Sequence, residues 1–310
     1  MTRIYDLIII GSGPAGLSAA VYAQRAQLNA VTVEKAPLSG GQVLTTNEID
    51  NYPGFPSISG FDLSMKLRKH ADDLLAVFIT DTVNGLSQSG GIIEVLGQKN
   101  RYKTRSVIIA TGAVHKKLEI PGEEKFSGRG VSYCATCDGM FFKDKTAAIA
   151  GGGDVALEDA AYLSRICKKV YIIHRRDTFR GAKSLQEKVF NRENIEIMWN
   201  TEVREIKGTD FVSEIIIENN KTNEKKALKT DALFVAVGVA PVSGIFKNTV
   251  ETDSGGYIIT NGDGETSVKG IYAAGDVTKK NFRQIITAAN DGANCVASIE
   301  KYLQEIPALT

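Results

Sequence analysis

The sequence predicts an α/β fold made of two domains of the same kind, the second inserted into the first. The chain opens with an apolar run, YDLIII, which a glycine-rich turn joins to a segment with the apolar spacing of a helix. The same succession recurs from residue 146. Two related apolar runs, TRSVIIATG and TDALFVAVG, close the copies, and no third copy begins after residue 245. We therefore expect one domain at 1–114 and 245–310, with the other at 115–244.

Composition and charge limit the classes of function. The chain has 310 residues, 43% of them hydrophobic and 24% charged, as expected of a globular protein with two cores. Its formal net charge of +1 offers no attraction to nucleic acid or to an anionic membrane. No apolar run approaches the ~18 residues of a membrane span, and the apolar start leads into a turn instead of a cleavage site. We expect a cytoplasmic protein that binds neither nucleic acid nor membrane.

The first glycine turn has the pattern of a dinucleotide-binding site. Gly11, Gly13 and Gly16 form G-x-G-x-x-G between a strand and a helix. The first glycine permits the tight turn, the second lets a pyrophosphate approach the backbone, and the third lets the helix pack closely on the strand. Glu34 ends the following strand, where a carboxylate accepts hydrogen bonds from ribose hydroxyls. This context predicts a Rossmann-like domain.

The second glycine turn repeats the pattern with the opposite charge at its ribose end. Gly151 and Gly153 lie in GGGDVA with Asp154 beside them, and the spacing from this turn to HRRDTFR equals that from the first turn to Glu34. The polar residues of HRRDTFR that could meet a ribose phosphate are His174, Arg175, Arg176 and Arg180. Arginine binds a 2′-phosphate with paired hydrogen bonds, whereas a carboxylate would repel it; a solvated basic turn is the alternative. We expect two Rossmann-like dinucleotide-binding domains, of which the second takes NADPH.

A CxxC pair, Cys134 and Cys137, lies within SYCATCDGMFF. Such a pair can belong to a zinc site, a structural disulfide or a redox couple. Structural zinc needs four ligands, but the other cysteines, Cys167 and Cys295, stand alone with the helical spacing of buried residues, and the histidines are scattered. Disulfides that form in the cytosol tend to be transient and catalytic. We therefore expect no metal site, and the redox interpretation is favoured.

Taken together, the motifs resemble bacterial-type thioredoxin reductases of low molecular weight, which are class II pyridine nucleotide-disulfide oxidoreductases. The resemblance runs along essentially the whole chain and is carried by GSGPAG, GGQ, NYPG, CATCD, GGGDVA, HRRDTFR and AAGDV followed by RQ. CATCD together with the basic turn is the specific combination. The resemblance implies FAD in the first domain, NADPH in the second, thioredoxin as the protein substrate and a homodimer.

The resemblance also assigns cofactor contacts by position. Asp276 would reach the ribityl or phosphate region of FAD, while Arg283, Gln284 and Ile285 would lie near the isoalloxazine ring. A plain turn is the alternative for the segment that begins at Asn51. The set implied for FAD is Gly11, Ser12, Gly13, Pro14, Ala15, Gly16, Glu34, Gly41, Gln42, Asn51, Gly275, Asp276, Arg283, Gln284 and Ile285. The set for NADPH is Gly151, Gly153, Asp154, His174, Arg175, Arg176 and Arg180.

The same resemblance gives the CxxC pair its roles. Electrons would pass from NADPH through FAD to a disulfide between Cys134 and Cys137, and on to thioredoxin. Cys137 would face the flavin, and Cys134 would attack the disulfide of thioredoxin through a mixed disulfide. Asp138 would supply a proton to a leaving thiolate as a general acid; a helix N-cap or a loop acid is its alternative role.

Two related enzymes and one non-enzymatic class are the alternatives. The flavoprotein of alkyl hydroperoxide reductase, which serves a peroxiredoxin system, carries an extra N-terminal redox domain, whereas this chain begins at the first strand. A ferredoxin-fed relative lacks the GxGxxA turn and the basic ribose site, and both are present here. The third alternative is a non-catalytic metal- or nucleotide-binding module.

Overall fold

The computed structural model describes residues 3–46, 49 and 51–306, without the side chains of Thr45 and Cys137. The chain forms two compact units: Met1–Val114 with Ala240–Thr310, and His115–Val239. In the first unit the helices and strands come from both ends of the chain, so the second unit is an insertion.

The inserted unit ends at Val239, whereas the sequence placed its end at residue 244. The residues that follow stay with the first unit because Val242 N–H donates to Gly112 O at 2.9 Å and Thr111 Oγ1 donates to Val242 O at 2.6 Å. The chain passes between the units along two short strands that pair with each other, β7 (Ala113–His115) and β16 (Val239–Pro241).

The first unit is built on a sheet of strand order β3-β2-β1-β6-β5-β4, with β17 also pairing to β6. β1, β2, β3, β6 and β17 are parallel, and β5 and β4 extend the sheet antiparallel. β1 is central because it is apolar on both faces, as parallel sheets covered on both sides require. The strands are β1 (Ile4–Ile10), β2 (Ala30–Glu34), β3 (Val77–Thr80), β4 (Val83–Ser89), β5 (Ile92–Gly97), β6 (Arg101–Ile109) and β17 (Ile271–Ala273).

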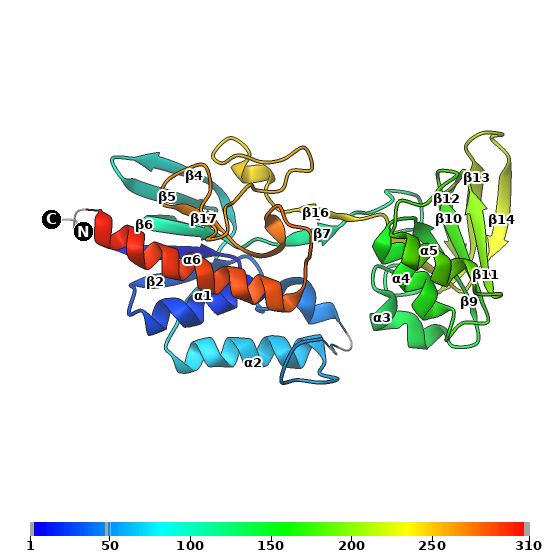
Figure 1. Ribbon diagram of the computed structural model, residues 1–310, viewed down its shortest axis with the longest axis horizontal. Helices are drawn as coiled ribbons and strands as arrows, with labels where there is room; N and C mark the ends of the chain where they lie inside the picture. Colours follow the sequence, from blue (N-terminus) through cyan, green and yellow to red (C-terminus); the bar gives the residue numbers. More distant parts are fainter. Residues whose placement is uncertain (1–2, 47–48, 50, 307–310) are drawn as a thin grey trace. The chain divides into compact units, whose positions relative to one another are not determined.

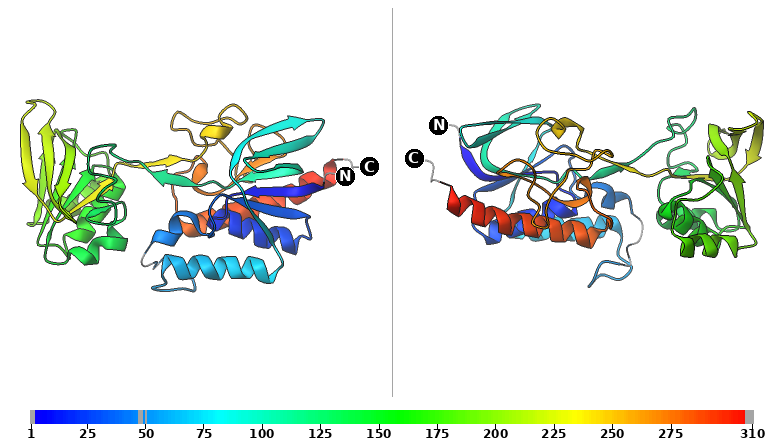
Figure 2. Two further views of the ribbon diagram at one scale, coloured as in Figure 1. Left: turned by 180° about the vertical axis from the view of Figure 1, so that it is seen from behind. Right: turned by 45° about the horizontal axis from the view of Figure 1, so that its top comes forward.

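Helices cover one face of this sheet. α1 (Pro14–Arg25) contacts both α2 (Gly60–Asp73) and α6 (Ile285–Glu305), and the three run side by side in Figures 1 and 2. Along β1, Leu7 and Ile9 pack into the helical layer, while Ile8 and Ile10 pack into a second core on the opposite face. Short 3₁₀ turns complete the unit: η1 (Gly41–Thr45), η3 (Gly244–Phe246) and η4 (Gly275–Val277).

The second unit has a parallel sheet of order β11-β10-β9-β15-β8. Ile149 of β9 packs against α4 on one face, and Ala148 and Ala150 pack on the other face against a small antiparallel sheet, β12-β13-β14. Its strands are β8 (Val131–Ser132), β9 (Thr146–Gly151), β10 (Lys169–His174), β11 (Ile195–Trp199), β12 (Thr201–Gly208), β13 (Val212–Asn219), β14 (Lys225–Lys229) and β15 (Ala232–Ala236). Its helices are α3 (Ala135–Asp138), η2 (Gly139–Phe142), α4 (Asp154–Leu163) and α5 (Lys183–Phe190).

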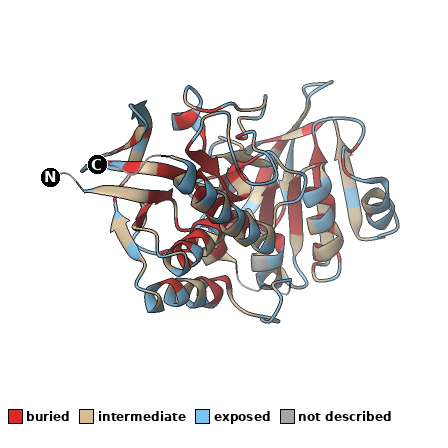
Figure 3. Cartoon of the chain, turned by 60° about the vertical axis from the view of Figure 1, so that its left-hand side comes forward, coloured by how far each residue is buried: buried red, intermediate tan, exposed pale blue. Residues whose placement is uncertain are grey.

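Both units therefore carry a parallel sheet whose central strand, β1 or β9, leads through a glycine turn into a helix, α1 or α4. Figure 3 shows the expected burial, with the central strands buried and the outer surfaces of the helices exposed. The predicted α/β class with two Rossmann-like units is confirmed. In the part of the chain that the structure describes, no helix is long and apolar enough to cross a membrane.

Candidate functional site

The first glycine turn connects β1 to α1. Gly11 has φ of 103°, in the left-handed region, and a Cβ there would press on the carbonyl oxygen of Ala110. A Cβ on Gly16 would collide with the carbonyl oxygen of Gly11. At Gly13, by contrast, the nearest atom to an added Cβ is the carbonyl oxygen of Gly40, 4.0 Å away. Chain packing thus requires the first and third glycines, while the second leaves room for a phosphate at the N-terminus of α1.

Glu34, at the end of β2, is hydrogen-bonded to this turn. Its Oε2 accepts from the backbone N–H and the hydroxyl of Ser12, at 2.7 and 2.9 Å, and its Oε1 accepts from Ala36 N–H at 2.9 Å. Since each carboxylate oxygen can accept two hydrogen bonds, Oε1 keeps one acceptor position for a ribose hydroxyl. Glu34 therefore both holds the turn and fits the predicted ribose contact.

Further predicted FAD contacts border the same turn. A Cβ on Gly41 would lie 3.6 Å from Cα of Gly13, and the next residue, Gln42, donates through Nε2 to the carbonyl oxygen of Ala113. Pro14 is the first residue of α1. The following residue, Ala15, is buried where a Cβ on Gly275 would meet it at 2.9 Å. These contacts bring the AAGDV motif against the GSGPAG turn.

Asn51 and Gln284 are distant in sequence but in contact in the fold. Asn51 Nδ2 donates to Gln284 Oε1 at 2.9 Å. Gln284 is the N-cap of α6 in a capping box with Thr287, and Ile285 packs on the small apolar cluster that contains Leu63. The turn at Asn51 is therefore tied to the start of α6, where the resemblance expects the isoalloxazine ring.

Buried polar atoms of Asp276 and Arg283 indicate whether the first unit fits a cofactor. Among the described residues, nothing hydrogen-bonds to its buried Oδ1 or to the buried Nε of Arg283. Burial raises the pKa of Asp276, while the positive charges of Lys280 and Arg283 act to lower it. Buried polar atoms normally have partners, so this acceptor and this donor fit a bound polar group such as the ribityl hydroxyls of FAD.

Two residues near Asp276 have no motif to mark them. Asp291 of α6 accepts from Gly275 N–H at 2.9 Å and pairs with Lys280. The guanidinium of Arg283 stacks on the ring of Tyr257, 4.0 Å from its centroid, and donates to Thr278 O at 3.2 Å. Sequence reasoning missed Asp291 and Tyr257 because they reach the site only through tertiary packing.

The second glycine turn, between β9 and α4, has the same steric constraints as the first. A Cβ on Gly151 would collide with the carbonyl oxygen of Ala236, whereas a Cβ on Gly153 would meet nothing within 4 Å. Asp154 begins α4, and its Oδ1 accepts from Ala182 N–H at 2.7 Å. Here too the middle glycine leaves room beside a helix N-terminus, which fits the pyrophosphate of a nicotinamide cofactor.

His174 lies beneath this turn and differs from its basic neighbours. Its side chain is 5% exposed, a Cβ on Gly152 would strike its ring, and its Nε2 lies 3.0 Å from Thr178 O. Burial lowers its pKa, the Thr178 hydrogen bond opposes this, and the nearby arginines lower the pKa further. The histidine therefore supports the turn as a neutral ring and adds no charge toward a phosphate.

The predicted arginines are exposed. Arg175, Arg176 and Arg180 form no ion pair within the ranges described. Their backbones are fixed: Arg180 N–H donates to Gly152 O at 2.8 Å, and Arg176 O accepts from Asn200 N–H at 3.1 Å. Guanidinium groups without a carboxylate partner, held beside a nucleotide-type turn, fit a 2′-phosphate.

The CxxC segment follows β8. Cys134 is half-buried and disulfide-bonded, and its Sγ lies 3.4 Å from Thr136 Oγ1. Cys137 lies in α3, but its side chain is outside the described part of the structure. Cys167 and Cys295 are free and buried. No cluster of three or more metal-ligand side chains occurs among the residues that the structure describes.

Asp138 ends α3, and its carboxylate is bound to a residue that sequence reasoning missed. Ser132 Oγ donates to Asp138 Oδ2 at 2.6 Å, and Asp138 N–H donates to Cys134 O at 3.2 Å. Ser132 stands just before the CxxC pair in SYCATCD, and that position was the available signal. The structure thus groups a disulfide, a carboxylate and a buried hydroxyl within one short segment.

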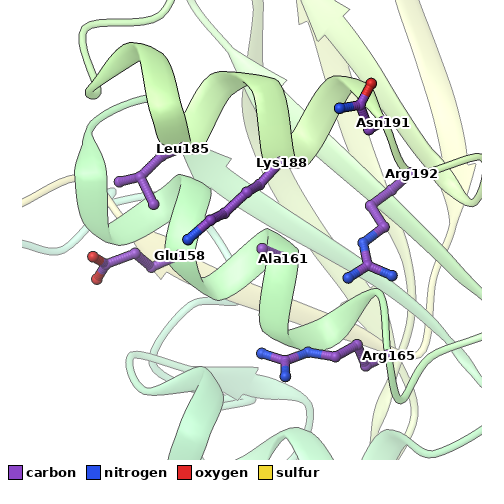
Figure 4. A pocket seen from close by; sticks show the side chains of 7 residues that line it. All are labelled: Glu158, Ala161, Arg165, Leu185, Lys188, Asn191 and Arg192. Carbon is purple, nitrogen blue, oxygen red and sulfur yellow. The ribbon is translucent and has the colours of Figure 1, made fainter.

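A hollow of about 610 Å³ lies between α4 and α5 (Figure 4). The charged residues around it are Glu158, Arg165, Lys188 and Arg192. It contains none of the predicted cofactor contacts. The cofactor sites are therefore identified from the glycine turns and not from this hollow.

Comparisons with known proteins agree with this geometry. The model of the pyridine nucleotide-disulphide oxidoreductase family matches residues 5–292. A thioredoxin reductase of Bacillus subtilis is 43% identical, over 98% of this chain and 96% of its own length. Crystal structures of thioredoxin reductases are also similar. That from Lactococcus lactis has a TM-score of 0.81 at 41% identity, covering 97% of this chain and all of the other. That from Streptococcus pyogenes has a TM-score of 0.79 at 42% identity, covering 99% and 100%.

The chain combines paired nucleotide turns of opposite charge, a disulfide-bonded CxxC cysteine beside a carboxylate, and similarity to thioredoxin reductases along nearly its full length. The chain belongs to the pyridine nucleotide-disulphide oxidoreductase family, among the bacterial-type thioredoxin reductases of low molecular weight.

Proposed function

We propose that this chain is an NADPH-dependent thioredoxin-disulfide reductase, in which electrons pass through FAD and the Cys134–Cys137 disulfide to thioredoxin. Family membership confirms the predicted cofactors, FAD and NADPH. The observation that carries the proposal is a disulfide-bonded Cys134 in the same unit as a glycine turn flanked by exposed arginines. Because Cys167 and Cys295 are free, the bond of Cys134 is assigned to Cys137.

The two cofactors supply the electron chemistry: NADPH is a hydride donor, and FAD couples that donor to a disulfide. The residues of the chain bind and orient them. In the first unit, Glu34 would accept from a ribose hydroxyl, the N-terminus of α1 would hold the pyrophosphate, and Asp276 would accept from the ribityl chain. In the second unit, Arg175 and Arg176 would bind the 2′-phosphate.

The CxxC pair then reduces the disulfide of thioredoxin by thiol–disulfide exchange. Once the Cys134–Cys137 disulfide has been reduced to two thiols with electrons from NADPH, the thiolate of Cys134 attacks one sulfur of the substrate disulfide. The other sulfur leaves as a thiolate that takes up a proton. The thiolate of Cys137 then attacks Cys134 in the mixed disulfide, which restores the Cys134–Cys137 bond and releases the second substrate thiol. Two electrons and two protons reach the substrate, and Asp138 acts as the general acid for a leaving thiolate.

The surface next to the CxxC pair supports a protein as the substrate. Met140 and Phe141, in η2 shortly after the pair, are 59% and 70% exposed. Large exposed apolar side chains mark sites of protein contact, and a small disulfide would not need them. We further propose a homodimer in the cytoplasm, on the basis of the family resemblance and of a redox disulfide suited to a reducing compartment.

The test uses the purified protein loaded with FAD. We expect NADPH, and far less NADH, to bleach the flavin, and we expect reduction of a disulfide dye to depend on added thioredoxin. Ferredoxin and a peroxiredoxin serve as the competing donor and acceptor. A flavin that NADPH leaves oxidised, or a dye reduced equally well without thioredoxin, would contradict the proposal.

A further inference from the structure

The hydroxyl of Ser132 occupies a buried position between the proposed acid and the backbone of Cys134. Ser132 is 5% exposed and ends β8. Its Oγ lies 2.6 Å from Asp138 Oδ2, 3.1 Å from Cys134 N and 3.2 Å from Cys134 O. The proposed function does not use this residue.

Two arrangements of hydrogens satisfy these contacts. A serine hydroxyl has one proton to donate and two lone pairs to accept with, and Cys134 N–H occupies one lone pair. When Asp138 is ionised, the hydroxyl donates to Oδ2, and 2.6 Å is the length typical of an O–H···O⁻ bond. When Asp138 is protonated, the carboxyl donates to the second lone pair of Ser132 Oγ, and the serine proton turns to Cys134 O. Both arrangements use the same positions of the heavy atoms.

We propose that Ser132 is a positioning residue that keeps Asp138 in one geometry through both of its protonation states. The inference rests on the proposed function, in which Asp138 gives a proton to a leaving thiolate in each catalytic cycle and must regain one. α3 has four residues, so its own hydrogen bonds provide little constraint on the carboxylate. Proton transfer requires the acid to lie within hydrogen-bond reach of the thiolate, and a displacement of ~1 Å is costly.

The contacts of Ser132 also couple the acid to the attacking cysteine. Ser132 Oγ accepts from Cys134 N–H, and Cys134 O accepts from Asp138 N–H. Removing the hydroxyl therefore leaves Cys134 N–H without this acceptor and leaves Asp138 Oδ2 without its donor. The expected defect lies in the rate of thiol–disulfide exchange and not in the binding of either cofactor.

The experiment compares Ser132→Ala, Ser132→Thr and Ser164→Ala in the FAD-loaded protein. Ser164 is the matched control, because it is a buried serine of the same unit whose hydroxyl donates to Ala161 O at 2.9 Å. Ser132→Ala should lower kcat for thioredoxin at least ~10-fold, but by less than the ~10²–10⁴-fold that loss of the acid itself would cost. The KM for thioredoxin and the bleaching by NADPH should be unchanged. Ser132→Thr, which keeps a hydroxyl, should restore most of kcat.

A double variant separates positioning from general stability. In an Asp138→Asn background, Ser132→Ala should reduce kcat by less than a further ~2-fold, because the group that it positions is already lost. Equal and independent losses in both backgrounds would overturn the proposal, as would an unchanged kcat in Ser132→Ala. A loss of kcat in Ser164→Ala equal to that in Ser132→Ala, with matching losses of melting temperature, would also overturn it. Failure of the wild-type protein to reduce thioredoxin would instead refute the proposed function.

Discussion

Replacing Arg175 and Arg176 together by alanine should raise the KM for NADPH about 100-fold and leave the KM for NADH almost unchanged. Both guanidinium groups are exposed, so each hydrogen bond to the 2′-phosphate is taken at the lower end of the charge-assisted range, ~1.5 kcal/mol. Two such bonds amount to ~3 kcal/mol, and ~1.4 kcal/mol corresponds to a factor of ten. His174 is left out of this sum because burial keeps its ring neutral.

The assay is steady-state reduction of a disulfide dye with saturating thioredoxin, run with each nicotinamide cofactor. Arg192→Ala is the control, because Arg192 is an exposed arginine of the same unit that lines the hollow between α4 and α5 (Figure 4). Since the attraction is electrostatic, the difference between wild type and the double variant should shrink as salt is raised. FAD should remain bound in all variants.

Two results would refute the reasoning. An equal rise in KM for NADPH and NADH would mean that the arginines support the fold of the turn and not the phosphate. No change for either cofactor would mean that the matched spacing of Glu34 and HRRDTFR from their glycine turns has misidentified the phosphate site.

Three further predictions concern the disulfide, the first glycine turn and a partly buried acid. Cys134→Ser or Cys137→Ser should abolish thioredoxin reduction but preserve bleaching of the flavin by NADPH; full turnover in either variant would exclude the redox assignment. Gly13→Ala should leave the melting temperature of the flavin-free protein unchanged, because an added Cβ meets nothing closer than 4.0 Å, but it should lower the amount of FAD bound per chain. Gly16→Ala should instead lower the melting temperature itself. Identical behaviour of the two variants would argue against a phosphate at Gly13. Burial raises the pKa of Asp159 to about 7, so the folded chain holds a proton that the unfolded chain releases near pH ~4. The free energy of unfolding should therefore fall as pH rises from about 4 to 7. In Asp159→Asn, urea unfolding should show a smaller fall of the free energy of unfolding over the same pH interval. A fall as large as that of the wild type would show that Asp159 is not its cause.

Local chemistry made much of this protein predictable from its sequence. Apolar periodicity and glycine spacing are properties of short segments, so the two strand–turn–helix units and the α/β class follow from YDLIII, GSGPAG and GGGDVA. The contrast between Glu34 and Arg175 is equally local, because Glu34 ends the strand that follows its turn and Arg175 comes directly after the corresponding strand. Steric need explains why these signals are reliable: Gly11 and Gly16 are required by the chain itself, whatever binds there.

Contacts between distant segments could not be predicted in the same way. The pairing of Asn51 with Gln284 depends on how α6 packs. Burial of Asp276 Oδ1, which has no hydrogen-bond partner among the described residues, likewise depends on how the first unit encloses it. His174 illustrates the same limit, since its sequence neighbours suggested a cation and its burial under Gly152 makes it a neutral support. The position of Ser132 between Cys134 and Asp138 likewise depends on where β8 ends and α3 begins. Burial and hydrogen-bond partners are set by atoms that only folding brings together, and they decide which of the residues in a motif carry charge, bind a ligand or hold another group in place.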